Sequence, residues 1–184
     1  MKRLFVAISP PQDLCRDIAE LARTVPGGRP VVPEQLHLTL KFIGEVEGGK
    51  LLDIREALGE ISRPAFSISL YGVGVFPPRG MPRVVWAGIE PAEEVDRLRR
   101  DIEKTLFTVG IPKEKQKFAP HLTLARLKDA NISRLQSFLG GNSLLRSPPF
   151  SVTAFTLFSS QLTAKGALHS EVAVYPLKAP PAAF

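Results

Sequence analysis

Two of the histidines in this sequence stand in the same four-residue motif. His-Leu-Thr-Leu begins at His37 and again at His121, an offset of 84 residues. An imidazole, with an unperturbed pKa of about 6.5, can accept or release a proton near neutral pH. The threonines of the two copies, Thr39 and Thr123, can donate hydrogen bonds to anionic oxygens. Two such pairs around one phosphorus atom would suit phosphodiester cleavage, with one imidazole activating water and the other protonating the leaving oxygen.

The motif is typical of a β-strand, in which side chains alternate between two faces. The leucines of both copies are therefore predicted to lie under helices, with histidine and threonine on the opposite face. If the two copies are related by a twofold axis, the two imidazoles can meet across a cleft. Arg126 could add a bidentate phosphate contact. It is five residues after His121, however, so on an ideal strand it faces away unless a bulge or twist re-aims it.

The motif belongs to a longer internal repeat. Pro64 and the segment 66–69 align with Pro148 and the segment 150–153 at the same offset of 84 residues. Leu51 likewise aligns with Leu135. Three matched blocks at one ungapped offset predict that the chain is an internal duplication.

Hydrophobic periodicity predicts secondary structure that repeats in the same order. Helices are expected at 13–22, 50–61, 92–109 and 132–139, and strands at 3–8, 36–43, 66–76, 83–89, 121–127, 150–159 and 171–175. We predict an α+β fold with two pseudo-symmetric lobes, in which two antiparallel sheets form a central cleft and helices cover their outer faces. Residues 1–177 would form this single bilobal domain, and residues 178–184 a flexible tail.

The composition narrows the class of protein. Hydrophobic residues make up 44% of the chain, which is enough for a core, and the net charge of +6 favours an anionic, phosphate-bearing partner. The single cysteine, Cys15, excludes an internal disulfide and a cysteine-rich zinc site. The apolar run at 4–8 is too short for a signal peptide, and no segment approaches membrane-spanning length. We expect a cytoplasmic monomer.

Some residues with reactive or ionisable side chains are interpreted as structural or as part of the surface. His169 has no partner in the repeat and is interpreted as a surface residue. Cys15 is interpreted as a small core or boundary residue. The lysines at 113, 115 and 117 either steer an RNA strand or belong to a solvated loop.

The chain resembles the RNA 2′,3′-cyclic phosphodiesterases of bacteria and archaea, also called 2′-5′ RNA ligases, in the two-histidine phosphoesterase superfamily. The resemblance covers nearly the whole chain. It is carried by the segments 3–8, 37–44, 83–88 and 120–126. The two motifs together within these segments are specific for the family, whereas either motif alone would not be.

The resemblance implies a metal-independent enzyme without a cofactor. It would open the 2′,3′-cyclic phosphate at an RNA end, such as that of a tRNA fragment, to give a 2′-phosphomonoester. His37 would donate a proton to the leaving 3′ oxygen and His121 would activate water. Arg126 matches an arginine that assists at the phosphate. The same chemistry with a ribose hydroxyl would form a 2′-5′ linkage. Phe5 and Phe42 could stack on a base, although burial in the core is the expected fate of each.

Three alternatives stay open at this point. The same site could act on another substrate, such as a cyclic nucleotide, ADP-ribose 1″,2″-cyclic phosphate or 2′-5′ oligoadenylate. The chain could instead bind RNA without turnover, although binding gives no reason for matched histidines and threonines. A metal site on the two histidines is disfavoured because neither motif brings a nearby carboxylate or a third histidine.

Overall fold

The strands and helices that the sequence predicts occur in the predicted order, together with short additional elements. The computed structural model describes residues 2–180 and 182. Its strands are β1 (Lys2–Ile8), β2 (Gly28–Pro30), β3 (Leu38–Val46), β4 (Phe66–Phe76), β5 (Val84–Glu90), β6 (His121–Leu127), β7 (Phe150–Val152), β8 (Ala154–Thr163) and β9 (Gly166–Pro176). Its helices are α1 (Gln12–Arg23), α2 (Gly48–Gly59), α3 (Glu93–Thr108) and α4 (Ile132–Gly141), with a 3₁₀ turn, η1 (Pro33–Gln35).

The strands form an antiparallel sheet with an internal symmetry. Its order is β7-β4-β5-β6-β3-β1-β8-β9, and β2 pairs with β6. On the two sides of the β6–β3 junction, β6 and β3, β5 and β1, and β4 and β8 occupy equivalent places. Each half of the sheet therefore mixes strands of both repeats, because β4 of the first repeat joins β5 and β8 of the second joins β1.

The predicted α+β class and antiparallel strands are confirmed, but the two predicted sheets are joined into one. The junction is a single residue pair, Leu38 with Leu122, which are the same residue of the two motif copies. This pair joins the two halves of the sheet. The two copies therefore meet edge to edge.

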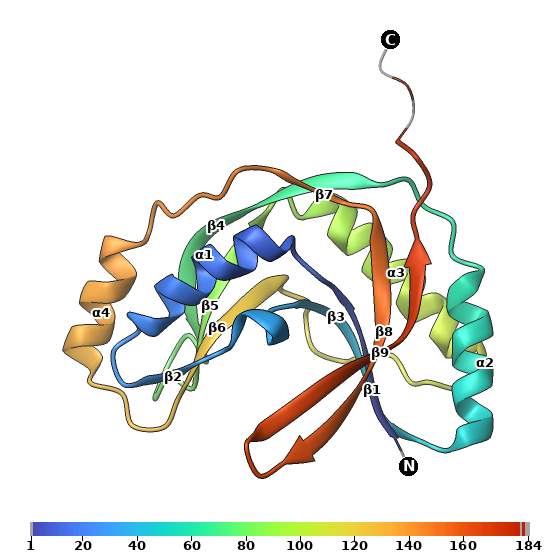
Figure 1. Ribbon diagram of the computed structural model, residues 1–184, viewed down its shortest axis with the longest axis horizontal. Coiled ribbons are helices and arrows are strands. Elements are labelled where there is room, and N and C mark those ends of the chain that lie inside the picture. The colour runs from blue at the N-terminus through green and yellow to red at the C-terminus, as the bar shows by residue number, and fades with distance from the viewer. Residues whose placement is uncertain (1, 181, 183–184) are drawn as a thin grey trace.

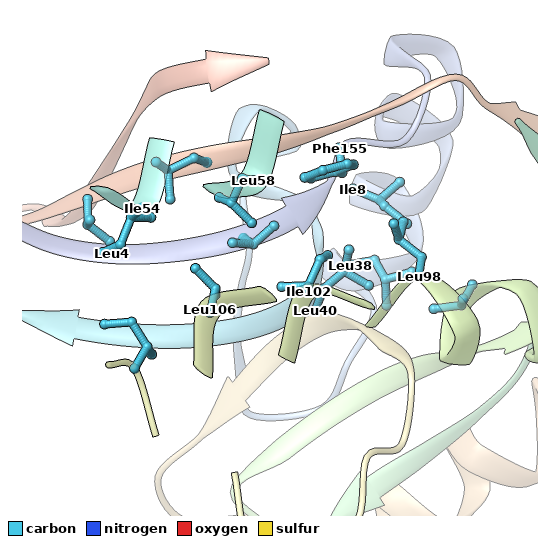
Figure 2. Close-up of a cluster of buried hydrophobic side chains, with 14 of the residues drawn as sticks. Leu4, Ile8, Leu38, Leu40, Ile54, Leu58, Leu98, Ile102, Leu106 and Phe155 are labelled. Atoms are coloured by element: carbon cyan, nitrogen blue, oxygen red, sulfur yellow. The ribbon is translucent and has the colours of Figure 1, made fainter. Parts of the chain in front are cut away.

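Helices cover one face of this sheet in two groups. Helices α1 and α4 lie over the half that contains β5 and β6, and α2 and α3 lie over the half that contains β1 and β3 (Figure 1). Two hydrophobic clusters fill the space between helices and strands. The first contains Leu38 and Leu40 from β3, packed against Leu58, Leu98 and Ile102 of the helices (Figure 2). We call the face opposite the helices the open face.

Strand β6 carries a bulge at the last residue of its motif. Val85 pairs with Ala125 and Trp86 with Thr123, so Leu124 is the extra residue. As a result, Leu124 and Ala125 both face the helices and are fully buried, and the alternation of side chains resumes one residue later.

Strand β3 carries the same bulge at the equivalent place. Val6 pairs with Lys41 and Ala7 with Thr39, so Leu40 is the extra residue. Lys41 is therefore turned to the helix face, where its side chain is only 2% exposed. The next residue, Phe42, returns to the open face and is 65% exposed.

The buried Lys41 ties the sheet to α3. Its Nζ lies 3.0 Å from Oε1 of Glu103 and donates a hydrogen bond of 2.8 Å to the carbonyl oxygen of Pro112. The guanidinium of Arg99 also lies 3.3 Å from the same Glu103 oxygen. A buried charge needs such partners, because an unpaired one costs several kcal/mol.

The structure adds elements that periodicity did not predict. Strand β2 and the turn η1 are three residues each, too short to show a period. The segment predicted as one strand at 150–159 is divided between β7 and β8. Strand β9 starts at Gly166 rather than at 171, and pairs with β8 in a long hairpin. The residues around its turn are mostly small or polar, which is typical of a loop.

The beginning of the predicted tail is attached to the fold. The backbone nitrogen of Lys178 donates to the carbonyl oxygen of Arg63, and its carbonyl oxygen accepts from the nitrogen of Ala65. Residues 181, 183 and 184 of that tail lie outside the described residues. In the part of the chain that is described, none of the helices is both long and apolar enough to cross a membrane.

Replacing Lys41 with alanine should destabilise the protein by about 3–5 kcal/mol, because it removes one partner of a buried ion pair. Urea unfolding followed by circular dichroism measures the change. Lys50→Ala is the matched control, since Lys50 is half-exposed and its Nζ lies 4.0 Å from Asp53. The control should change the free energy of unfolding by less than about 1 kcal/mol. Equal, small effects for the two variants would contradict the assigned role of Lys41.

Candidate active site

The junction of β3 and β6 brings together the two histidines and two threonines that the sequence predicts for the site. Leu38 and Leu122 pair as antiparallel neighbours and point under the helices, where they are 2% and 1% exposed. Their chain neighbours therefore point to the open face. Continuing the register by one residue sets His37 beside Thr123 and Thr39 beside His121. The paired leucines thus lie at the centre of a twofold arrangement of functional side chains.

Both imidazoles are held by the same backbone contact. Nδ1 of His37 lies 2.6 Å from the carbonyl oxygen of Gln35, and Nδ1 of His121 lies 2.8 Å from that of Ala119. A carbonyl can only accept, so Nδ1 donates in both rings and carries a proton. Nε2 is then the nitrogen free to accept or release a proton. Gln35 and Ala119 are themselves 84 residues apart, so the repeat supplies this orientation twice.

The rings that surround the two histidines differ. The centroid of the His37 ring lies 4.9 Å from that of Phe5 and 5.3 Å from that of His169. On the other side, the His121 centroid lies 4.9 Å from that of Phe76. The two halves of the site are therefore alike in backbone and unlike in their lining.

Burial makes both imidazoles weaker bases than a free histidine. Desolvation lowers the pKa of His37 to about 4, against the hydrogen bond to Gln35, which raises it. The charges of His169, Arg126 and His121 contribute to this lowering of the pKa after desolvation. Desolvation also lowers the pKa of His121, and the hydrogen bond to Ala119 opposes that shift. At neutral pH, without an anion in the site, both rings are mainly neutral.

Arg126 lies on the open face, although its spacing from His121 is odd. The bulge at Leu124 supplies the change of face that the sequence alone leaves open. Its guanidinium is near enough for its charge to lower the pKa of both His37 and His169. The structure thus places a cation near His37 and His169.

The two phenylalanines have different fates. Phe5 is buried, as expected, and its ring contacts those of His37, Phe158 and His169. Burial of Phe42 was the wrong expectation, because the β3 bulge turns it to the open face. Phe42 and Arg126 occupy the same position in the two repeats.

His169 is the residue at the site that sequence analysis missed. It was interpreted as a surface residue ahead of the last strand, but it lies within β9 and its ring stands edge-on to that of His37 at 84°. Its Nδ1 is buried, without a hydrogen-bond partner among the described residues. No repeat or period marks this residue in the sequence, because only the pairing of β9 with β8 brings it to the site.

The residues described by the structure include no group of three or more His, Cys, Asp or Glu side chains arranged to hold a metal ion. The site is instead built from imidazoles, hydroxyls, a guanidinium and aromatic rings. Such a set can exchange protons and bind an anion.

The family of the chain follows from sequence comparison. The model of the LigT like Phosphoesterase family matches residues 8–86 and 89–169, one range in each repeat. The chain belongs to this family. The RNA 2′,3′-cyclic phosphodiesterase of Archaeoglobus fulgidus is 35% identical, over 94% of this chain and 99% of that protein. The protein of the same name from Aeropyrum pernix is 38% identical, over 81% of this chain and 85% of that protein.

Solved structures share the fold. The crystal structure of TT0787 from Thermus thermophilus matches with a TM-score of 0.81 at 30% identity, over 96% of this chain and 98% of that one. E. coli LigT complexed with 3′-AMP matches with a TM-score of 0.80 at 26% identity, with the same coverage. A nucleotide is thus bound by a LigT-like phosphoesterase of similar structure.

Replacing His169 with glutamine should raise the pKa of His37, because the charge of His169 is one of the influences that lower it. Titration of the imidazole carbon-bound protons by NMR measures this pKa, which should be about 4 in the unchanged protein. Asn142→Gln at the end of α4 is a control that should leave it unchanged. A His37 pKa near 6.5 in the unchanged protein would contradict the burial of this ring.

Proposed function

We propose that this protein hydrolyses the 2′,3′-cyclic phosphate at the end of an RNA strand to a 2′-phosphomonoester, without a metal ion. The observation that carries this proposal is the pair of imidazoles on the two sides of the Leu38–Leu122 junction, each with Nδ1 bound to the backbone and Nε2 free. The names of the relatives support the cyclic phosphate as the substrate class.

In this proposal the two histidines act from opposite sides of the phosphorus atom. Nε2 of His121 takes a proton from water as the water oxygen attacks phosphorus. Nε2 of His37 gives a proton to the 3′ oxygen as its bond to phosphorus breaks. The lowered pKa of His121 suits a base that must be neutral before it acts.

His37 must be protonated when it acts, and the substrate supplies the reason. In the free protein the positive charge of Arg126 helps to lower its pKa. A bound phosphate anion neutralises this charge and attracts a proton to His37, so that its pKa rises when substrate binds. In this way the binding of substrate favours the protonated form of His37, which is the form that can act as the acid.

Thr39, Thr123 and Arg126 would hold the non-bridging oxygens. The register sets each hydroxyl beside the histidine of the other repeat, so the two can donate to oxygens between the rings. Arg126 would add a charge-assisted contact to the same anion. The exposed lysines 113, 115 and 117, just before β6, could attract the rest of the RNA strand.

The same arrangement, with a ribose hydroxyl in place of water, would join RNA ends through a 2′-5′ linkage. Ends of tRNA fragments are candidate substrates for either reaction. A cytoplasmic location and a monomeric state stay predictions.

The proposal is tested by incubating the protein, in EDTA, with an oligonucleotide that ends in a 2′,3′-cyclic phosphate. The expected product is the 2′-phosphomonoester, identified by chromatography against both isomers. His37→Ala and His121→Ala should each lower kcat/KM by about 10²–10⁴-fold, because each removes one proton-transfer group. Thermal unfolding by circular dichroism checks that these variants are folded.

Several results would contradict this proposal. A kcat/KM close to that of the unchanged protein in either folded variant would remove that histidine from the mechanism. Activity lost in EDTA but restored by a divalent ion would show a metal site. Binding of the oligonucleotide without any product would favour an RNA-binding protein. Faster turnover of a cyclic mononucleotide than of the oligonucleotide would indicate the wrong substrate class.

A further inference from the structure

A pocket of 220 Å³ lies next to His37 and is not used by the proton-transfer chemistry. We call it the β9 pocket and define it by six of the residues that line it: Glu34, Gln35, His37, Phe158, His169 and Glu171. Drug-sized ligands occupy cavities of about 300–1,000 Å³. The β9 pocket is therefore suited to a smaller group, such as a single nucleobase.

The walls of this pocket are fixed to each other. One wall is η1 with the residues that follow it, and the other is the hairpin of β8 and β9. The Gln35 side-chain nitrogen donates to the carbonyl oxygen of Ala167, and the Arg29 guanidinium donates to that of Lys165 at 3.0 Å. These bonds tie the hairpin to β2 and η1, so the pocket is formed before a ligand arrives.

The β9 pocket lies on the side of the site where the last nucleotide of the proposed substrate would bind. This step rests on the proposed function, in which His37 protonates the 3′ oxygen. That oxygen belongs to the ribose of the last nucleotide, so this ribose and its base must lie on the His37 side of the phosphorus atom. The β9 pocket is on that side, since His37 itself lines it.

The chemistry of the lining indicates what the pocket can accept. Glu34 and Glu171 have no Lys, Arg or His partner within 4.0 Å among the described residues, in a chain whose net charge is +6. Two free carboxylates repel a phosphate, so the pocket does not extend the anion site. They accept hydrogen bonds from N–H donors. The ring of Phe158, which stacks on that of Phe5, belongs to the same lining and gives the pocket an aromatic wall.

We infer that the β9 pocket binds the last base of the RNA and selects it by its hydrogen-bond donors, through Glu34 and Glu171. Guanine presents N1–H and N2–H₂ side by side, which match the two oxygens of one carboxylate. Adenine and cytosine present one amino group beside a ring nitrogen that accepts. Uracil presents a single N–H between two carbonyl oxygens, which a carboxylate repels. Guanine should therefore be the preferred last base and uracil the least favoured.

The inference is tested with four oligonucleotides that differ only in the base that carries the 2′,3′-cyclic phosphate. For the unchanged protein, kcat/KM for a guanine end should exceed that for a uracil end by about 5- to 150-fold, the range of one bidentate contact to a base. The double variant Glu34→Gln and Glu171→Gln should bring this ratio close to one. Glu56→Gln, which changes an exposed carboxylate on α2, is the matched control and should keep the ratio of the unchanged protein.

Calorimetry with guanosine 2′-phosphate and uridine 2′-phosphate gives a second measurement that does not need turnover. The unchanged protein should bind the guanosine compound more tightly, and the double variant should not distinguish them. A ratio near one in the unchanged protein, or an equal ratio in the double variant, would overturn the inference and leave the proposed function intact. Absence of hydrolysis at all four ends would instead overturn the proposed function.

Discussion

The pairing of Leu38 with Leu122 is the contact on which the rest of this structure depends. These leucines hold the same place in two copies of one motif, and when a residue pairs with its own repeat equivalent, the twofold axis passes between the two. The groups around them are therefore doubled: an imidazole and a hydroxyl lie one residue away on either side, and the carbonyl that orients the ring lies three residues before each leucine. A four-residue motif forms a two-sided site in this way, because the pairing of β3 with β6 places its two copies next to each other.

The two repeats place the two histidines in equivalent positions, and the residues that differ between the repeats give the two histidines different surroundings. In each repeat the bulge turns the second residue after it to the open face, and this residue is Phe42 in one repeat and Arg126 in the other. Among the described residues, a third imidazole and the β8–β9 hairpin lie beside His37, and Phe76 lies beside His121. An acid and a base need unlike surroundings, since each must hold a different charge before the reaction. The unlike linings are consistent with that need.

Much of the site could be predicted from sequence because its residues repeat. The offset of 84 residues marked His37, His121 and the two threonines, and strand alternation placed their leucines correctly under the helices. The bulge that Arg126 needs could be named as a condition, but its presence depends on the register with β5. His169 could not be found, because its position results from the pairing of β9 with β8, and the residues around the turn of this hairpin are mostly small or polar and show no clear period.

A crystal structure with a nucleoside–vanadate complex tests most directly whether the junction holds a phosphorus centre between two imidazoles. Vanadium in such a complex has five oxygen neighbours, as phosphorus does when one oxygen attacks and another leaves. Nε2 of His37 and Nε2 of His121 should lie within about 3.2 Å of the two opposite apical oxygens. Vanadate bound away from the β3–β6 junction, or in contact with only one of the two imidazoles, would contradict the two-sided site.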